Sequence, residues 1–362
     1  GPPVFQKYDF GETDVLVMPN YRIMPATNTT QSELSIDIHP TNSSIMFAGS
    51  NATNWPYSTI YGTGVYWTTD AGLTWGGNNN PTSLFGSTNS GDPAAVIGSN
   101  GNFYMGYIRN GNGQGVATST NNGATWSSSI AGSDVAYPNL LDKNHLMVDK
   151  KVGSPFENRV YDTWTHFVSG NASNNQVVIN YSTNSGTSWS TFVDLSSSLS
   201  PGSHAQGTNV QTGPNGEVYV TFAIYDAWPG GEDAIGFAKS TDGGATWTKT
   251  RIYSAVNFGI RGNIKPTSIR VSSFPSMAVD RSGGASNGYI YIVWPQIGVA
   301  PAGTDPDIVL IRSTNNGATW SARKPQIRDR RRPQRILGQR NEAIGHRIRH
   351  ARDDMADLVG GG

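Results

Sequence analysis

The sequence contains no cysteine, few charged residues and no long apolar run. Of the 362 residues, none is Cys, and Asp, Glu, Lys and Arg together make up only 14%. The absence of cysteine excludes disulfides and thiolate chemistry, although it does not fix the redox compartment. No apolar stretch is long enough for a transmembrane helix. No signal peptide is recognisable, so we expect a mature or trimmed chain.

Glycine and aromatic residues are abundant instead. The chain has 43 Gly, and aromatic residues make up 10% of it. Together with many Ser, Thr and Asn, this composition predicts many short strands joined by tight polar turns. Few charges, many Asn and Thr and no Cys are also typical of bacterial secreted proteins. We therefore expect a secreted or cell-surface protein.

The net charge of zero hides an asymmetry between the two ends of the chain. Residues 321–362 contain ten Arg and one Lys against five acidic residues, a balance of +6. Residues 1–320 consequently carry a balance of −6. A mildly acidic body argues against a nucleic-acid partner.

An octapeptide recurs five times and is the strongest signal in the sequence. Its copies begin at Thr68, Ser119, Ser182, Ser240 and Ser313, and their starts are 51, 63, 58 and 73 residues apart. One supersecondary unit in each period of this length indicates a repeat architecture. The copies read TTDAGLTW, STNNGATW, STNSGTSW, STDGGATW and STNNGATW.

Each octapeptide is expected to form the turn of a hairpin, with Trp beginning the outgoing strand. Asp or Asn at the third position can close an Asx-type turn, and the invariant Gly at the fifth suits a positive φ. The Asp could alternatively be a metal ligand or catalyst, but three copies carry Asn, which closes the same turn and cannot act as an acid or base. The predicted structural positions are Asp70, Gly72, Trp75, Asn121, Gly123, Trp126, Asn184, Gly186, Trp189, Asp242, Gly244, Trp247, Asn315, Gly317 and Trp320.

The segments before each octapeptide alternate between apolar and polar residues in three short runs. With the strand after the turn, this gives four strands per repeat, which is the unit of a β-propeller blade. We predict an all-β propeller with its blades in residues 31–323. The expected first and second strands of the five blades are 33–38 and 44–49, 92–96 and 103–107, 145–149 and 159–164, 206–210 and 217–222, and 275–280 and 289–294.

The octapeptides resemble the Asp box, or BNR repeat, of the sialidase superfamily and other secreted β-propellers. The resemblance covers residues 31–323 and is specific for the fold rather than for an activity. It implies that each box joins the third and fourth strands of a blade, on the face away from the active site. It also implies six or seven blades. We expect six, with strands from residues 1–30 helping to close the ring.

Residues 324–362 do not fit this pattern. From Ile327 onward there is no aromatic residue, no alternating strand and no octapeptide, whereas Arg330, Arg331 and Arg332 are consecutive. Two interpretations stay open: the tail is foreign or out of frame, or it is a genuine basic, partly helical extension. Arginine-rich runs of this kind are commonly solvated tails.

A propeller binds ligands at its central channel, near the start of each innermost strand. The densest polar cluster expected there is Asp142-Lys143-Asn144-His145, in which Asp142 and His145 could form an acid/base pair or bind a metal. A network of paired charges lining the channel is the alternative. The ligand-binding candidates are Glu33, Asp92, Asp142, Lys143, His145, His204, Gln206, Arg251, Arg261 and Arg270.

The sialidase resemblance implies three arginines for a substrate carboxylate, a Tyr–Glu nucleophile pair and an acidic Asp. Tyr225 with Glu232, and Asp142 as the acid, are the candidates for the catalytic groups. Arg251, Arg261 and Arg270 could converge, and Arg22 is either a further residue of the carboxylate site or an exposed arginine at a strand end. The family pattern is not matched position by position.

Two functions are therefore predicted. The first is an extracellular binding or structural propeller that presents its channel mouth to a glycan or protein. The second is an exo-glycosidase of the sialidase type. No cofactor is expected and no metal motif is present, since the histidines are too scattered, although a structural Ca²⁺ would be compatible with such a fold.

Overall fold

The computed structural model describes most of the body of the chain. The described residues are 6–9, 14–17, 23–25, 28–54, 60–80, 89–109, 113–133, 141–167, 175–199, 204–261, 271–300 and 303–325; of 6–9, 14–17, 60 and 324–325 it describes the backbone alone. The basic tail from Ile327 to Gly362 lies outside this set, as do Arg22 and Arg270.

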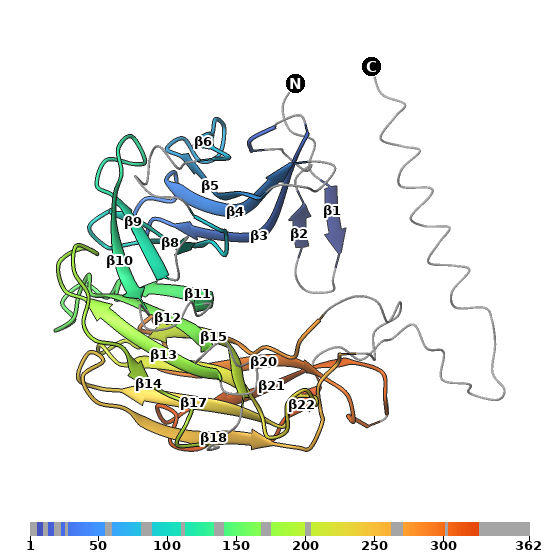
Figure 1. The fold of residues 1–362 in the computed structure, drawn as a ribbon. Helices are drawn as coiled ribbons and strands as arrows, with labels where there is room; N and C mark the ends of the chain where they lie inside the picture. Colours follow the sequence, from blue (N-terminus) through green and yellow to red (C-terminus); the bar gives the residue numbers. More distant parts are fainter. Residues whose placement is uncertain are drawn as a thin grey trace, which may run out of the picture. The chain divides into compact units, whose positions relative to one another are not determined.

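Five antiparallel sheets of four strands each make up the described body (Figure 1). In every sheet the strands follow in chain order, so that each strand pairs with the next along the sequence. This is the meander of a propeller blade. Blade one is β3 (Thr29–Ile38), β4 (Met46–Asn54), β5 (Ile60–Thr68) and β6 (Gly76–Asn78). Blade two is β7 (Ala94–Ile97), β8 (Phe103–Arg109), β9 (Gly113–Ser119) and β10 (Ser127–Ser133).

The remaining three blades repeat the same order. Blade three is β11 (Leu141–Val148), β12 (Val160–Phe167), β13 (Asn175–Ser182) and β14 (Val193–Asp194). Blade four is β15 (His204–Thr212), β16 (Val218–Tyr225), β17 (Ala234–Ser240) and β18 (Thr248–Ser254). Blade five is β19 (Ser276–Val279), β20 (Ile290–Gln296), β21 (Asp307–Ser313) and β22 (Lys324–Pro325).

Neighbouring blades pack face to face through apolar side chains. Phe47 of blade one stacks on Phe103 of blade two, with ring centroids 4.8 Å apart. Tyr161 of blade three and Phe222 of blade four share one buried cluster, and Phe237 of blade four and Trp294 of blade five share another. The first strands β3, β7, β11, β15 and β19 contact one another in succession, so they are the innermost strands.

All five octapeptides join the third and fourth strands of their blades. In blade four the Ser240 hydroxyl donates to Asp242 Oδ1 at 2.8 Å and accepts the Gly244 N–H at 2.8 Å. Asp242 Oδ1 also accepts the Thr246 N–H at 2.9 Å. The same three bonds recur in the other four copies, with Asn in place of Asp in blades two, three and five. Asp and Asn at the third position of the octapeptide therefore accept the same backbone N–H group.

Two details of these turns differ from the expectation. The Trp residues precede the outgoing strand instead of beginning it: β18 starts at Thr248, and the fourth strands of blades three and five have only two residues. The fourth position is left-handed as well as the fifth, because two consecutive positive-φ residues are needed for this reversal. Its occupants are Ala71, Asn122, Ser185, Gly243 and Asn316.

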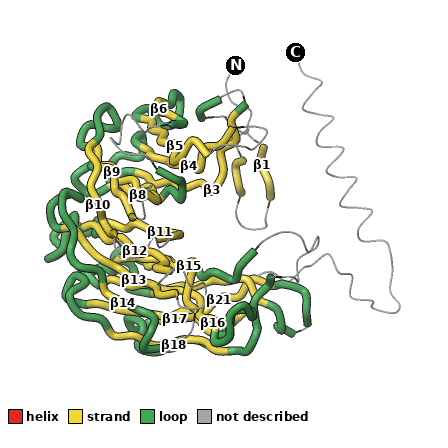
Figure 2. The backbone as a smooth tube through the Cα atoms, viewed as in Figure 1, coloured by secondary structure: helices red, strands yellow, loops and turns green. Residues whose placement is uncertain are grey.

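The number of blades in the whole chain stays a prediction. Five four-stranded sheets are described, and β1 (Gln6–Asp9) and β2 (Asp14–Val17) form a separate two-stranded sheet. The described residues contain strands, turns and loops without any α-helix (Figure 2). No helix in this part of the chain is therefore long and apolar enough to cross a membrane.

Candidate functional site

The same backbone irregularity recurs in the innermost strands. The pairing register of β3, β11 and β15 slips by one residue, at 33–34, 143–144 and 207–208. Glu33, Lys143 and Gly207 there have φ values of 51°, 55° and 73°, and Asp92, just before β7, has 55°. A bulge re-aims a side chain, and each non-glycine residue held at positive φ costs about 1–2 kcal/mol. Such strain concentrates at functional sites.

Three of the predicted residues, each at positive φ, come together at one mouth of the channel. The Lys143 ammonium lies 3.0 Å from Glu33 Oε2 and 3.9 Å from Asp92 Oδ1. The Lys143 N–H also donates to Asp92 Oδ2 at 3.0 Å, and the Asp92 N–H donates to Asn51 Oδ1 at 2.7 Å. Three blades therefore contribute to one charge cluster, in which the Lys143–Glu33 contact joins residues 110 positions apart in the sequence.

Asp142 completes this cluster and lies beside Asp92. Burial raises the pKa of Asp92, and hydrogen bonding to the neighbouring Asp142 carboxyl raises it further. Burial alone would lower the pKa of Lys143, but the carboxylates of Asp92 and Glu33 outweigh it and raise that pKa. Lys143 is consequently a stable cation at neutral pH.

A cavity of about 410 Å³ opens over the cluster. Charged groups form one part of its wall, and Thr208, Phe274 and Pro275 form another. The Glu33 side chain is 44% exposed and that of Lys143 32%, whereas Asp92 is only 13% exposed. A ligand entering here therefore meets an accessible carboxylate and ammonium, with a half-buried carboxyl behind them.

Tyr225 and Glu232 form a second cluster, on the loop between β16 and β17. The Tyr225 hydroxyl donates to Glu232 Oε1 at 2.8 Å, and the Ser273 N–H donates to the same oxygen at 2.7 Å. Both side chains are almost completely buried. Burial raises the pKa of Tyr225 above its usual range, the Glu232 carboxylate raises it further, and the Arg261 guanidinium opposes this. The predicted pair is thus in direct contact, as a neutral phenol and its acceptor.

The predicted channel residues His204 and Gln206 belong to this second cluster instead of the charged mouth. His204 is buried, its Nε2 lies 3.2 Å from Gln206 Oε1, and its ring stacks on Trp228 with centroids 3.9 Å apart. The expectation that His204 lines the channel was wrong for this reason: the Trp228 ring covers it. A lone His at a strand start gives no sequence signal of such stacking.

The predicted pairing of Asp142 with His145 is also absent from the described residues. The bulge at 143–144 separates the two, so that Asp142 contacts Asp92 while His145 points between blades three and four. There, His145 Nδ1 accepts the Val210 N–H at 3.3 Å. Burial lowers the pKa of His145 to about 4. A neutral packed imidazole is the result, not an acid/base partner.

The predicted arginines lie in different surroundings. Arg251 forms an ion pair with Asp226 at 2.6 Å, whereas Arg261 interacts with Tyr225. Arg270 and Arg22 lie outside the described residues. Arg159 donates to the Gly243 carbonyl at 2.6 Å and Arg312 covers the Tyr289 ring, both away from the mouth. No arginine triad is present in the described part of the chain, and that part also contains no group of three His, Cys, Asp or Glu that could hold a metal ion.

Comparison with known proteins identifies the fold. No protein-family model matches the sequence, and no curated protein matches it. Solved structures do match: a Hadza microbial sialidase, Hz136, has a TM-score of 0.51 and 17% identity over 82% of this chain. The fold is that of a sialidase-like β-propeller. The present chain spans 58% of the length of that sialidase.

Two fungal glycosidase structures share the propeller fold. An α-L-arabinanase of Penicillium chrysogenum, complexed with arabinobiose, has a TM-score of 0.50 and 15% identity over 80% of each chain. The GH93 α-L-arabinofuranosidase of Fusarium graminearum, also with arabinobiose, has a TM-score of 0.50 and 14% identity over 83% of this chain and 84% of the other. At such identities the similarity concerns the architecture of the propeller.

Proposed function

We propose that this propeller is a secreted or cell-surface glycan-binding protein, and that its charged channel mouth binds a terminal sugar. The observation that carries the proposal is the Glu33–Lys143–Asp92 cluster under the cavity that Phe274 also lines. Sugar hydroxyls donate to carboxylates and accept from an ammonium. The apolar face of a sugar ring suits an aromatic wall, and convergent polar groups in a cavity fix orientation.

The same geometry favours recognition over cleavage at the mouth. Two-carboxylate hydrolysis needs carboxyl groups about 5–9.5 Å apart with the scissile bond between them. Here Lys143 lies between Glu33 and Asp92, while Asp92 and Asp142 are in direct hydrogen-bonded contact. Neither pair leaves a free space for an attacking group. Charged donors and acceptors that stay paired at rest can exchange their bonds with a hydroxylated ligand.

Carbohydrate as the ligand class is supported by the named neighbours of the same fold. They are a sialidase, an α-L-arabinanase and an α-L-arabinofuranosidase, and the last two are complexed with arabinobiose. An extracellular protein is the alternative partner for the mouth.

Titration of the intact chain with arabinobiose and with a sialic acid glycoside, followed by saturation-transfer NMR, tests the proposal. The decisive variant is Lys143→Gly, because Gly207 occupies the corresponding bulge of blade four and tolerates its φ. Loss of charged hydrogen bonds should weaken binding by about 10–100-fold. Lys151→Gly is the matched control, since Lys151 is exposed beyond the far end of β11. Equal affinities of both variants, or no glycan binding at all, would refute a glycan site at the mouth.

A second candidate function is hydrolysis of a terminal glycosidic bond, and it depends on the Tyr225–Glu232 contact. A Tyr hydroxyl that donates to a buried carboxylate at 2.8 Å has the arrangement of an activated nucleophile and its base. Release of a fluorophore from aryl glycosides of sialic acid and arabinofuranose measures this activity. Tyr225→Phe should abolish turnover while leaving binding at the Lys143 mouth intact. No turnover by the folded wild-type chain would leave only the binding function.

A further inference from the structure

A second polar cavity adjoins the first along the channel, and the walls of both include Leu34, Pro93 and Asn144. Its volume is about 380 Å³, and its wall includes Asp37 of β3, Lys150 after β11, Gln211 of β15 and Arg281 after β19. These residues follow the bulges along the innermost strands, so the cavity lies toward the end of the blades where the octapeptide turns are. Four blades thus contribute polar groups that do not line the proposed glycan site.

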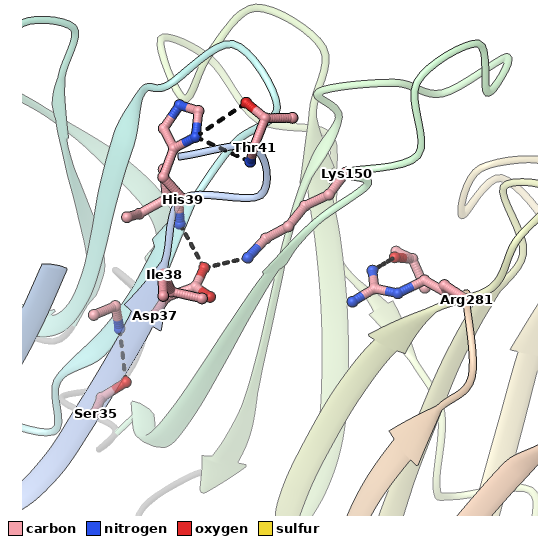
Figure 3. Close-up of polar contacts among 10 residues, drawn as sticks. Ser35, Asp37, Ile38, His39, Thr41, Lys150 and Arg281 are labelled. Carbon is pink, nitrogen blue, oxygen red and sulfur yellow. Dashed lines mark hydrogen bonds and ion pairs between the residues drawn. The ribbon is translucent and has the colours of Figure 1, made fainter. Parts of the chain in front are cut away.

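Two cations face this cavity, and among the described residues only Lys150 has an acidic partner in contact. Lys150 forms an ion pair with Asp37, whose Oδ2 also accepts the Ile97 N–H at 2.7 Å (Figure 3). Across the cavity, Arg281 Nη1 donates to Thr212 Oγ1 at 3.0 Å (Figure 3). That is the single hydrogen bond of the Arg281 guanidinium within the described residues, which leaves most of its five N–H donors unused.

Acidic groups near Arg281 do not compensate for this deficit. Asp149 uses its oxygens for the Lys151 N–H at 3.1 Å and for the Ser154 hydroxyl. Burial lowers the pKa of Arg281, and the attraction of Asp149 and Asp37 offsets that only in part. The Lys150 pKa is likewise lowered by burial; Asp37 opposes this in part, and the charge of Arg281 adds to the lowering. The two cations therefore repel each other across one cavity.

Gln211 supplies a third donor. Its amide lines the same cavity and is half-buried, and it makes no side-chain hydrogen bond to any described residue. A partly desolvated guanidinium with free donors binds planar or tetrahedral oxyanions through paired hydrogen bonds. The Lys150 ammonium and the Gln211 amide add hydrogen-bond donors from other parts of the cavity wall.

We infer that this cavity is an oxyanion-binding site, in which Arg281, Lys150 and Gln211 hold a carboxylate, sulfate or phosphate group. The Arg281 fork faces two oxygens of the anion, and Lys150 shares its charge between the anion and Asp37. The bound anion relieves the repulsion between the two cations. The anion can be inorganic or can be the acidic group of a sugar, since both present the same oxygens.

Isothermal titration of the full chain with sodium sulfate, sodium phosphate and sodium glucuronate tests the inference. Sodium chloride at matched ionic strength and neutral glucose are the reference titrations. Saturable binding of one or more oxyanions is expected, with no saturation by either reference. Tighter binding of glucuronate than of the inorganic ions would identify an acidic sugar, and the reverse order an inorganic ion.

Arg281→Gln should weaken that binding by about 10–100-fold, because it removes charge-assisted bonds. The matched control is Arg312→Gln, since Arg312 is exposed on β21 and covers Tyr289. Arg281→Lys and Gln211→Ala serve as milder variants if Arg281→Gln does not fold, and both should weaken binding by a smaller factor. Equal affinity in Arg281→Gln and Arg312→Gln, or no saturable binding of any oxyanion, would overturn the inference. Lys143→Gly should leave this binding unchanged, which separates it from the glycan site.

Discussion

The interior blades and the end blades of the described body are built from the same strands but bury them differently. In blade four, all eight residues of β16 are buried, because blades three and five cover its two faces. In blade five, burial alternates along β20: Ile292 and Trp294 are buried against blade four, whereas Tyr291 and Val293 on the other face are half-buried. The side chains are mostly apolar on both faces in each case.

Blade one shows the same asymmetry at the other end. Ser35 and Asp37 of β3 face blade two and accept its backbone N–H groups at 2.9 and 2.7 Å. On the opposite face, Leu34 is 76% exposed and Ile36 is 63% exposed. A propeller sheet thus needs a neighbour on each side, and the comparison teaches that burial follows position in the series rather than composition of the strand.

The largest expected difference between interior and end blades is the loss of stability when an isoleucine is shortened to alanine. Ile224→Ala in β16 should lower the free energy of unfolding by about 2–5 kcal/mol, because the buried cavity cannot be filled. Ile36→Ala on the exposed face of β3 should change it by less than about 1 kcal/mol. Urea denaturation of both variants measures this. Similar losses would mean that the outer face of blade one is covered in solution.

The next largest effect should be a loss of folding stability in acid. It should come from His145, which lies between the interior blades three and four. His145 has a pKa lowered to about 4, so the unfolded chain binds its proton more tightly than the folded one. Its contribution is fully present above about pH 6.5 and is lost as the pH falls toward 4, by up to about 3 kcal/mol. His145→Gln should flatten that part of the curve of unfolding free energy against pH. His39→Gln on blade one is the control, and an unchanged slope in His145→Gln would contradict the assignment.

A smaller effect is expected from the octapeptide acids, one in an end blade and one in an interior blade. Hydrogen bonds from Thr74 and Thr246 hold the pKa of Asp70 and of Asp242 at about 2. Because these pKa values are below those of the unfolded chain, the contribution is present above about pH 4 and is lost toward pH 2.

The double variant Asp70→Asn, Asp242→Asn tests this prediction. At pH 7 its unfolding free energy should stay close to that of the wild type, since Asn serves in the other copies. Between pH 4 and 2 its melting temperature should fall less steeply. A large loss at neutral pH would show that charge, not turn closure, determines the choice of Asp at these two positions.

The smallest change in stability belongs to Ile36→Thr, which keeps a β-branched side chain on the exposed face. Unfolding free energy should shift by no more than about 0.5 kcal/mol, while binding of a hydrophobic fluorescent dye should fall. The matching Ile292→Thr in blade five should unfold far more easily, because a hydroxyl would be buried there. Unchanged dye binding by Ile36→Thr would exclude this face as the accessible apolar surface.

The sequence predicted the blade pattern well because each octapeptide carries its own turn chemistry. The second strand of blade four was expected at 217–222 and is β16, and that of blade two was expected at 103–107 and is β8. The six-bladed ring stays a prediction, since five sheets are described. The octapeptide turns were predictable because their hydrogen bonds join residues that are close together in the sequence.

The site was harder to predict because it depends on contacts across blades and on backbone irregularities. Lys143 was a candidate, but its bulge is not visible in an alternating pattern, and that bulge separates Asp142 from His145. The Tyr225–Glu232 contact was predictable since both residues border one short loop. Arg281 was passed over, because its cavity is formed by strands more than 100 residues apart in the sequence.

The octapeptide turn has one more consequence, for how such a chain changes over time. Each of the three recurring bonds around Ser240 and Asp242 spans at most four residues. A turn stabilised by such local contacts can form early, before distant strands have met. A gene segment that encodes one repeat therefore carries its folding instructions with it. Duplication or deletion of a whole repeat leaves every remaining turn able to form, so recombination can alter the number of blades without redesigning any of them.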